Sequence, residues 1–216
     1  ENEITILPSE KVNDISIVVE SDWSSASYFY SIVALSENTK IKLSSYRKDS
    51  LQGDAALSRI YESLGVKTEF LDAENAIVLS KSGVEIQDNI QFDLANTPDI
   101  AQTIAVSCFG LGRGCILTGL HTLKIKETDR LVALKMELEK LGARVEISED
   151  SLQLYSSNEV VKHIAIDTYH DHRMAMAFAP LGLKVPITIN DCGVVSKSFP
   201  SFWEDMTRIG VSVTRV

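Results

Sequence analysis

A long-period repeat constrains the fold of this chain more than any other feature of its sequence. Three nearly apolar segments recur along it, at 24–36 (SSASYFYSIVALS), 97–110 (TPDIAQTIAVSCFG) and 170–183 (HDHRMAMAFAPLGL). Ser24, Pro98 and His172 occupy matching positions, 74 residues apart both times. Segments with so little polar face predict helices that are buried on all sides. Because solenoid repeats run about 20–50 residues, the longer period indicates a repeated α/β unit within one domain.

The same elements follow each apolar segment. A β-like run comes next, at 39–43 (TKIKL), 114–119 (GCILTG) and 186–191 (PITIND). A second helix then ends in an apolar-Gly pair and leads into a strand, as in SLGVKTEF, KLGARVEI and RIGVSVTR. The first two copies continue into a paired strand, at 76–80 and 152–156. We therefore predict one domain over 1–216, with units at about 15–88, 89–165 and 166–216, the third incomplete.

The second helices have a different pattern. In the second copy one stripe of the helix is apolar: Leu131, Leu134, Leu138 and Leu141. The charged residues lie largely off this stripe: Lys135, Glu137, Glu139 and Lys140. This amphipathic pattern predicts a surface helix over a sheet. The two helix types together predict buried inner helices ringed by sheets and outer helices.

Composition and charge narrow the function classes. No apolar run reaches the roughly 18 residues of a membrane span, and the start ENEITILPSEK lacks the features of a signal peptide. A net charge of −9 argues against a general nucleic-acid surface, so any bound anion needs a local basic cluster. Cys108, Cys115 and Cys192 have no CxxC spacing, which argues against a disulfide framework or a zinc site and favours the cytoplasm.

Charged residues gather where the predicted helices begin. Asp99 follows an Asn-Thr-Pro entry, and Asp171 opens the third apolar helix. Carboxylates at such positions are either helix caps or parts of a site, and both interpretations stay open here. Arg130 and Arg173 also stand at helix starts, where a cation opposes the helix dipole. Their placement indicates a compensating anion, which is either a bound ligand or an ion-pair partner at the surface.

A charged slot precedes the second helix in every copy. The three slots are YRKDSLQGD (46–54), KIKETDR (124–130) and the segment VVSKSF around Lys197. Three equivalent positions of one repeated fold favour a shared cleft over three separate surface clusters.

Five motifs with compatible spacing carry a resemblance to a known family: SSASYF (24–29), LQGD (51–54), KETDRL (126–131), DHRMAM (171–176) and SKSFPSFW (196–203). In this relation along the chain they resemble the 5-enolpyruvylshikimate-3-phosphate synthase family, from about residue 15 to 216. The resemblance implies the α/β (α+β) class. It implies an inside-out enolpyruvyl transferase domain built of repeated βαβαββ units around buried parallel helices. Two such domains enclose the active site, and this chain is expected to be the C-terminal half.

The resemblance also implies a reaction. The enolpyruvyl group of phosphoenolpyruvate is transferred to the 5-hydroxyl of shikimate 3-phosphate, and phosphate is released, in aromatic amino-acid biosynthesis. No metal or organic cofactor is expected. The expected partner is the N-terminal half of the same polypeptide, in a full-length monomer that binds neither nucleic acid nor membrane. An isolated chain 1–216 is expected to be inactive.

Roles for individual residues follow from the same resemblance. Asp99 resembles the carboxylate that contacts the shikimate hydroxyls and acts as a base. Glu127 resembles the acid/base that protonates the phosphoenolpyruvate methylene, a step that needs burial to keep a Glu protonated among cations. The expected substrate contacts are Arg130, Arg173 and Lys197 on phosphoenolpyruvate, Lys126 on the shikimate phosphate and His172 beside this clamp. Thr122 stands where many relatives have an Asn that touches shikimate, so its role is left open.

Three other functions compete with this interpretation. UDP-N-acetylglucosamine enolpyruvyl transferase shares the fold but needs other residues in the KETDR slot. A non-catalytic interaction or assembly domain on the same scaffold should have lost charges that this chain keeps, such as Asp99 and Lys197. RNA-end processing is disfavoured by the acidic balance of the chain.

Overall fold

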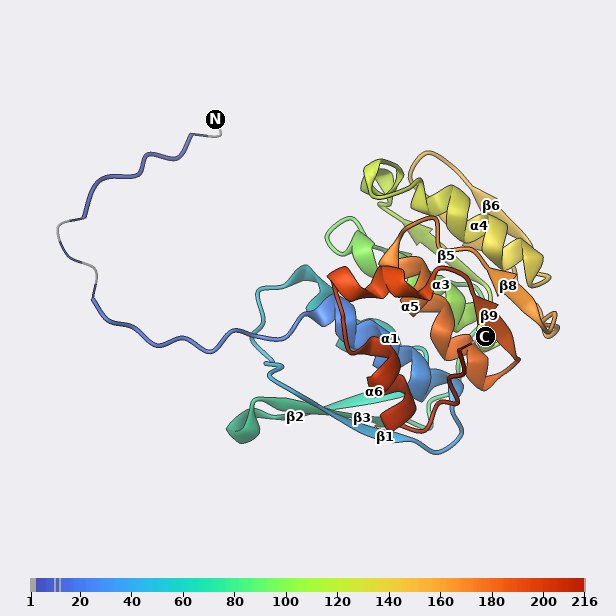
Figure 1. Cartoon of the computed structure of the whole chain (residues 1–216), viewed down its shortest axis with the longest axis horizontal. Coiled ribbons are helices and arrows are strands. Elements are labelled where there is room, and N and C mark those ends of the chain that lie inside the picture. Colours follow the sequence, from blue (N-terminus) through green and yellow to red (C-terminus); the bar gives the residue numbers. More distant parts are fainter. Residues whose placement is uncertain (1–2, 10, 12, 216) are drawn as a thin grey trace.

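Three buried helices form the centre of the molecule. The computed structural model describes residues 3–9, 11 and 13–215. The helices α1 (Trp23–Leu35), α3 (Ala101–Gly110) and α5 (His172–Phe178) pack against one another, and the sheets and the other helices surround them (Figure 1). Nearly every residue of the three helices is buried. The predicted arrangement of inner and outer helices is therefore confirmed, and the class is α/β.

The first sheet has three described strands in the order β1-β3-β2, and each neighbouring pair is antiparallel. Its strands are β1 (Lys40–Ser44), β2 (Val66–Leu71) and β3 (Ala76–Lys81), with α2 (Leu57–Glu62) between β1 and β2. Two short 3-10 helices, η1 (Gly53–Ala56) and η2 (Asp72–Glu74), complete this region.

The second sheet has the order β4-β5-β7-β6, in which β4 and β5 are parallel and the other pairs antiparallel. Its strands are β4 (Ile90–Asp93), β5 (Cys115–Thr118), β6 (Val145–Ile147) and β7 (Leu152–Leu154). The helices η3 (Pro98–Ile100) and α3 follow β4, and η4 (His121–Ile125) and α4 (Arg130–Lys140) follow β5. This region therefore has the full βαβαββ sequence of elements.

The third sheet consists, among the described residues, of the parallel pair β8 (Ile164–Ile166) and β9 (Ile187–Ile189). Its helices are α5, η5 (Ala179–Leu183), η6 (Cys192–Lys197) and α6 (Phe202–Arg208). Strand β8 begins 74 residues after β4, the same period that separates the matching positions Ser24, Pro98 and His172 in the sequence.

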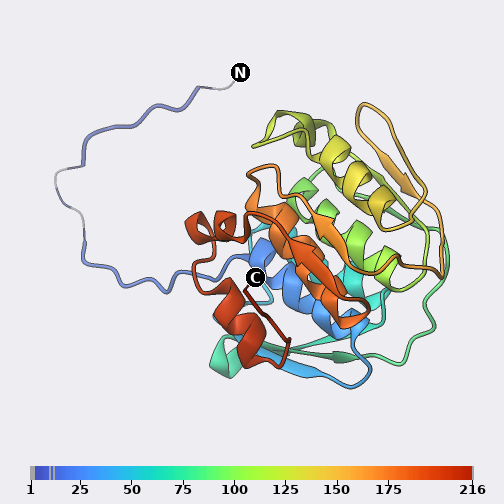
Figure 2. The same ribbon diagram turned by 45° about the vertical axis from the view of Figure 1, so that its right-hand side comes forward.

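The segment 16–19 lies 74 residues before β4 but forms no strand in the described structure. It belongs to a stretch that extends away from the body of the molecule in two views (Figures 1 and 2). Ile17 and Val19 are 76% and 80% exposed. The first region therefore lacks the opening strand that the βαβαββ pattern predicts.

Hydroxyl groups join α1 to α3 inside the core. The Oγ of Ser27 lies 3.1 Å from Thr103 Oγ1, and Ser107 Oγ donates to Ser31 Oγ at 2.8 Å. The hydroxyl of Tyr61 lies 2.8 Å from Ser107 Oγ. Small polar side chains let the helices approach closely while they satisfy each other's hydrogen bonds, as buried polar groups require.

Helix α4 follows the predicted amphipathic pattern with one exception. Its four stripe leucines are fully buried, and Lys135 and Glu139 remain partly exposed. Glu137, however, is 0% exposed, so its assignment to the surface was wrong. The reason is tertiary: the segment before α5 covers this side of α4, and Tyr169 donates to Glu137.

The aromatic and cysteine side chains of the inner segments belong to the core. Tyr28, Phe29, Cys108 and Cys115 are buried, and Trp203 packs against the core. Three histidines outside the site are exposed: His121, His163 and His170. In the part of the chain that the structure describes, no helix combines the length and the hydropathy needed to span a bilayer.

Gly53, the first residue of η1, lies where the first two regions pack closely together. A Cβ at Gly53 would lie 2.2 Å from the backbone oxygen of Asn96. We expect Gly53→Ala to lower the free energy of unfolding by about 1–3 kcal/mol, as overpacking does, in urea denaturation. A Cβ at the exposed Gly193 meets nothing within 4 Å, so Gly193→Ala serves as the control and should change stability by less than about 0.5 kcal/mol. Equal effects of the two substitutions would contradict the packing argument.

Candidate active site

The buried guanidinium of Arg130 is the centre of the site. Arg130 is the first residue of α4, and Asp129 caps this helix by accepting from Val132 N at 3.2 Å. The Arg130 side chain is 2% exposed. It donates through Nε to Asp171 Oδ2 at 2.6 Å, through Nη1 to Asp99 Oδ1 at 3.0 Å and through Nη2 to Glu127 Oε2 at 2.6 Å. One side chain thus joins three carboxylates from the starts of three helical segments.

Asp99 receives two further cations. Arg173 Nη2 donates to Asp99 Oδ2 at 3.1 Å, and Lys126 Nζ lies 3.4 Å from Asp99 Oδ1. Burial of the carboxyl opposes its ionisation, but Arg173, Lys126 and Arg130 outweigh this effect and lower the pKa of Asp99. Asp99 is therefore an ionised acceptor at neutral pH.

Glu127 joins the second helical region to the third. Its side chain is 31% exposed, and Lys197 Nζ lies 3.4 Å and His172 Nδ1 3.8 Å from its Oε1. Partial burial raises the pKa of Glu127, but a backbone hydrogen bond and the charge of Arg130 more than offset this, so the net shift is downward. The role expected of Glu127 as a proton donor requires a raised pKa, and in the described chain the pKa of Glu127 is lowered.

Asp171, His172 and Arg173 begin α5 and point into the same cluster. Asp171 is fully buried and caps the helix by accepting from Arg173 N at 2.8 Å. Burial lowers the pKa of His172, with Asp171 opposing and Arg173 adding to the shift, so its imidazole is neutral at pH 7. Among the described atoms, His172 Nδ1 and Arg173 Nε are buried without a hydrogen-bond partner.

All seven predicted site residues therefore lie in one cluster: Asp99, Lys126, Glu127, Arg130, His172, Arg173 and Lys197. Four cationic side chains face three carboxylates, Asp171 being the third, which leaves an excess of one positive charge in a chain of net charge −9. The anion expected opposite the helix-start arginines is provided in the described structure by these carboxylates.

Two residues near the site were missed or left open by sequence reasoning. The sequence left open whether Asp171 is a cap or a site residue. In the structure it is both, because it caps α5 and pairs with Arg130. No pattern in the sequence indicates the second contact. Thr122, in η4, has a buried hydroxyl without a hydrogen-bond partner among the described atoms.

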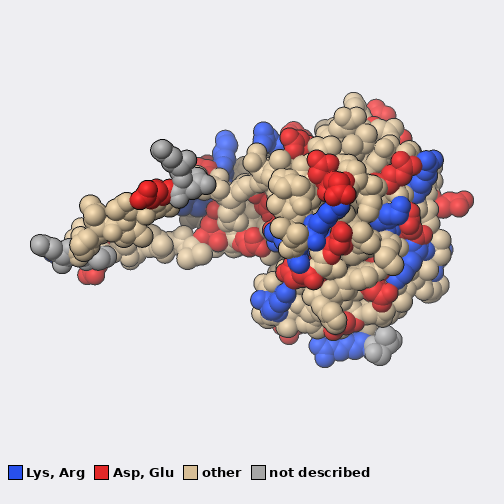
Figure 3. Space-filling model, turned by 90° about the horizontal axis from the view of Figure 1, so that it is seen from above, with Lys and Arg blue, Asp and Glu red and all other residues tan. Residues whose placement is uncertain are grey.

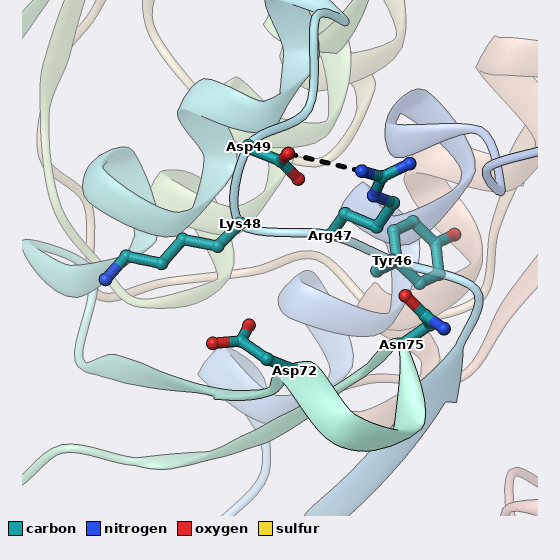
Figure 4. Close-up of a pocket in the computed structure, with 6 residues that line it drawn as sticks. All are labelled: Tyr46, Arg47, Lys48, Asp49, Asp72 and Asn75. Atoms are coloured by element: carbon teal, nitrogen blue, oxygen red, sulfur yellow. Dashed lines mark hydrogen bonds and ion pairs between the residues drawn. The ribbon is translucent and has the colours of Figure 1, made fainter.

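The first charged slot contributes differently from the other two. Lys197 of the third slot reaches Glu127 of the second. In the first slot Arg47 pairs with Asp49, and both line a separate cavity of about 620 Å³ with Tyr46, Lys48, Asp72 and Asn75 (Figure 4). Residues at both ends of this slot approach the helix starts: Tyr46 donates to the backbone oxygen of Asp22, and Asp54 accepts from Ser24 and Thr97.

The wider electrostatics and the ligand types limit what the cluster can bind. Acidic and basic side chains are interspersed over the face shown in Figure 3. Ligand atoms of Glu127, Asp171 and His172 lie within 4.8 Å of one another. Both carboxylates are already paired with Arg130, so a metal ion would have to compete with a buried cation. The donor-rich arrangement suits a small anion with several oxygens better.

Comparison with known proteins identifies the family. The sequence profile of the family described as EPSP synthase (3-phosphoshikimate 1-carboxyvinyltransferase) matches residues 1–206. This chain belongs to the EPSP synthase family. Relatives named 3-phosphoshikimate 1-carboxyvinyltransferase include one from Bacteroides fragilis, 42% identical over 202 residues, which cover 92% of this chain and 48% of the relative. One from Sulfurovum sp. is 38% identical over 195 residues, with 90% and 44% coverage.

Solved structures give the same fold. EPSP synthase from Acinetobacter baumannii matches with a TM-score of 0.74 at 24% identity, over 90% of this chain and 47% of that one. The enolpyruvyl transferase NikO from Streptomyces tendae matches with a TM-score of 0.62 at 13% identity, over 91% and 44%. The chain thus spans about half the length of the curated relatives and structures that it matches.

Removing the central cation should destabilise this EPSP synthase family chain. Arg130→Met leaves the fully buried Asp171 without its charged partner, a change that costs about 3–5 kcal/mol. Arg208, 76% exposed and paired with Asp205, provides the control. Arg208→Met should cost less than about 1 kcal/mol. Urea denaturation of the two variants measures the difference, and similar costs would contradict a central role for Arg130.

The lowered pKa of Asp99 predicts the pH dependence of stability. Because the folded pKa lies below that of the unfolded chain, Asp99 stabilises the fold fully above the unfolded value of about 4. This stabilisation is lost as the pH falls through the lower folded value. Asp99→Asn should therefore be less stable than wild type at pH 7, and the gap should close at low pH. A gap that stays constant down to pH of about 2.5, in urea denaturation, would contradict this.

Proposed function

We propose that the protein containing this chain is a 3-phosphoshikimate 1-carboxyvinyltransferase. It would transfer the enolpyruvyl group of phosphoenolpyruvate to the 5-hydroxyl of shikimate 3-phosphate and release phosphate. The observation that carries the proposal is the cluster around Arg130, in which four cations and two candidate acid/base carboxylates meet within a chain of the EPSP synthase family.

The cations have the chemistry that phosphoenolpyruvate requires. This substrate carries a carboxylate and a phosphate, and planar guanidinium groups form bidentate hydrogen bonds with both. In the proposal Arg130, Arg173 and Lys197 hold phosphoenolpyruvate, and His172 lines the same end of the site. Lys126, which reaches Asp99, binds the phosphate of shikimate 3-phosphate. Fixed positive charges also stabilise the leaving phosphate.

The two carboxylates would move protons. Asp99 is ionised at neutral pH because of its cations, so it can accept hydrogen bonds from the shikimate hydroxyls and act as a base. Glu127 is likewise a base in the described chain. Anionic substrate bound to Arg130 and Lys197 would weaken their effect on Glu127 and raise its pKa. The binding step would thus prepare Glu127 to protonate the phosphoenolpyruvate methylene and later to take a proton back.

The rest of the active site is expected from the N-terminal half of the same polypeptide. The chain spans about half of its curated relatives, and the family resemblance places the site in a cleft between two halves. A cytoplasmic monomer is the form we propose for the complete protein.

Phosphate release tests the activity. We expect the full-length protein to release phosphate from phosphoenolpyruvate only when shikimate 3-phosphate is present, and the purified chain 1–216 to release none above background. No turnover by the full-length protein would favour a non-catalytic interaction domain. Turnover only with UDP-N-acetylglucosamine as acceptor would assign the related transferase activity.

Glu127→Gln tests the proton-transfer role in the full-length protein. Glutamine keeps the shape of Glu127 but cannot donate or accept the proton, so we expect kcat to fall about 10²–10⁴-fold. Glu149 pairs with Lys124 and is 94% exposed, so Glu149→Gln is a matched control that should keep kcat within about twofold of wild type. A Glu127→Gln variant with wild-type kcat would exclude Glu127 as the acid/base.

A further inference from the structure

Glu137 is a buried carboxylate that the proposed chemistry does not use. It lies on α4 seven residues after Arg130, and because this spacing is close to two helical turns, both side chains are on the same side of the helix. Glu137 is 0% exposed. Its Oε1 accepts from the hydroxyl of Tyr169 at 2.6 Å, and its Oε2 accepts from Lys140 Nζ at 2.8 Å and from the backbone N of Asp167 at 3.1 Å. A buried acid with three donors is fixed in position.

The segment that Glu137 holds has an unusual backbone. Tyr169 and His170 have φ angles of 54° and 58°, so two consecutive non-glycine residues lie in the left-handed region. Side chains disfavour this region, and such conformations persist where surrounding contacts enforce them. Glu137 binds this segment at two points, the amide of Asp167 before the turn and the hydroxyl of Tyr169 within it. Lys140 also binds Asp167 Oδ2, at 2.7 Å.

The turn leads directly into the site. The amide of Asp171 donates to Thr168 O at 2.8 Å, so the position of Asp171 depends on the preceding turn. Asp171 then contacts Arg130 Nε and the amide of Arg173. Helix α4 is thereby joined to the segment entering α5 twice, by Arg130 with Asp171 in the site and by Glu137 with Tyr169 outside it.

We propose that Glu137 and Tyr169 are positioning residues that fix the turn before α5, and thereby hold Asp171 against Arg130 and aim His172 and Arg173 at the substrate anion. They touch no substrate themselves. The consequence for catalysis rests on the proposed function, in which Arg130 and Arg173 hold phosphoenolpyruvate. The consequence for local structure does not depend on it.

The kinetic test uses Tyr169→Phe and Glu137→Gln in the full-length protein. Tyr169→Phe removes one hydroxyl and leaves the other two donors to Glu137, so it keeps the experiment informative if Glu137→Gln fails to fold. Misplaced arginines should raise the KM for phosphoenolpyruvate about tenfold, because small displacements of binding groups have large effects. The KM for shikimate 3-phosphate should change less. A purely structural role would lower the active fraction and the Tm but leave both KM values unchanged, and this result would overturn the proposal.

Glu139→Gln is the matched control. Glu139→Gln removes one negative charge from the same helix, as Glu137→Gln does. The Glu139 side chain, however, is 42% exposed and paired with Lys135. We expect wild-type KM values for this variant. An equal rise in the KM for phosphoenolpyruvate in Glu139→Gln would overturn the assignment, because the effect would then come from the charge of α4 as a whole.

Amide hydrogen exchange on the chain 1–216 separates the two proposals. If Tyr169 fixes the turn before α5, the amides of Asp171 and Arg173 exchange faster in Tyr169→Phe than in wild type, while the exchange rates of the α1 amides are unchanged. Unchanged exchange at both positions overturns the positioning role even if the enzyme is active. If the wild-type full-length protein has no transferase activity, the proposed function fails, and faster exchange at Asp171 and Arg173 still supports the positioning role.

Discussion

The structure of the site depends on the burial of one guanidinium group. Removing Arg130 from water is costly unless each of its donors finds a charged or polar acceptor. Two of its carboxylate partners, Asp99 and Asp171, are about 30–40 residues away along the chain, and the third, Glu127, is 3 residues away. The starts of α3, α4 and α5 are therefore held at one end of the domain. The geometry that fixes Arg130 also sets where Asp99, Glu127 and Arg173 lie.

The repeat explains how these helix starts come to the same end. Each copy has an apolar helix and a charged slot before the next helix, and the same 74-residue period separates the matching positions Ser24, Pro98 and His172 and the strands β4 and β8. Parallel inner helices then present equivalent residues on one face of the molecule. The hydroxyl contacts between α1 and α3 allow this close parallel packing. The cluster of seven candidate residues is a consequence of this order.

The mutual neutralisation of the cluster has a chemical consequence. The carboxylates stabilise the buried cation, and the surrounding cations in turn lower the pKa of Asp99 and Glu127 and keep both ionised. A substrate anion competes with these carboxylates for the same donors. In the proposed enzyme, binding and proton transfer are coupled in this way, because an anion that engages Arg130 and Lys197 removes part of the charge that holds Glu127 ionised.

The sequence by itself determined the repeat, the buried and amphipathic helices, the charged slots and the family, because these depend on periodicity and on short motifs. It also identified residues that meet in the folded chain, such as Asp99 and Arg130. Only the tertiary structure decided that Glu137 is buried, that Asp171 binds Arg130 and that Arg47 lies apart from the site. It also decided that the pKa of Glu127 is lowered. Each of these depends on what a distant segment places against the residue, and local sequence patterns carry no record of such contacts.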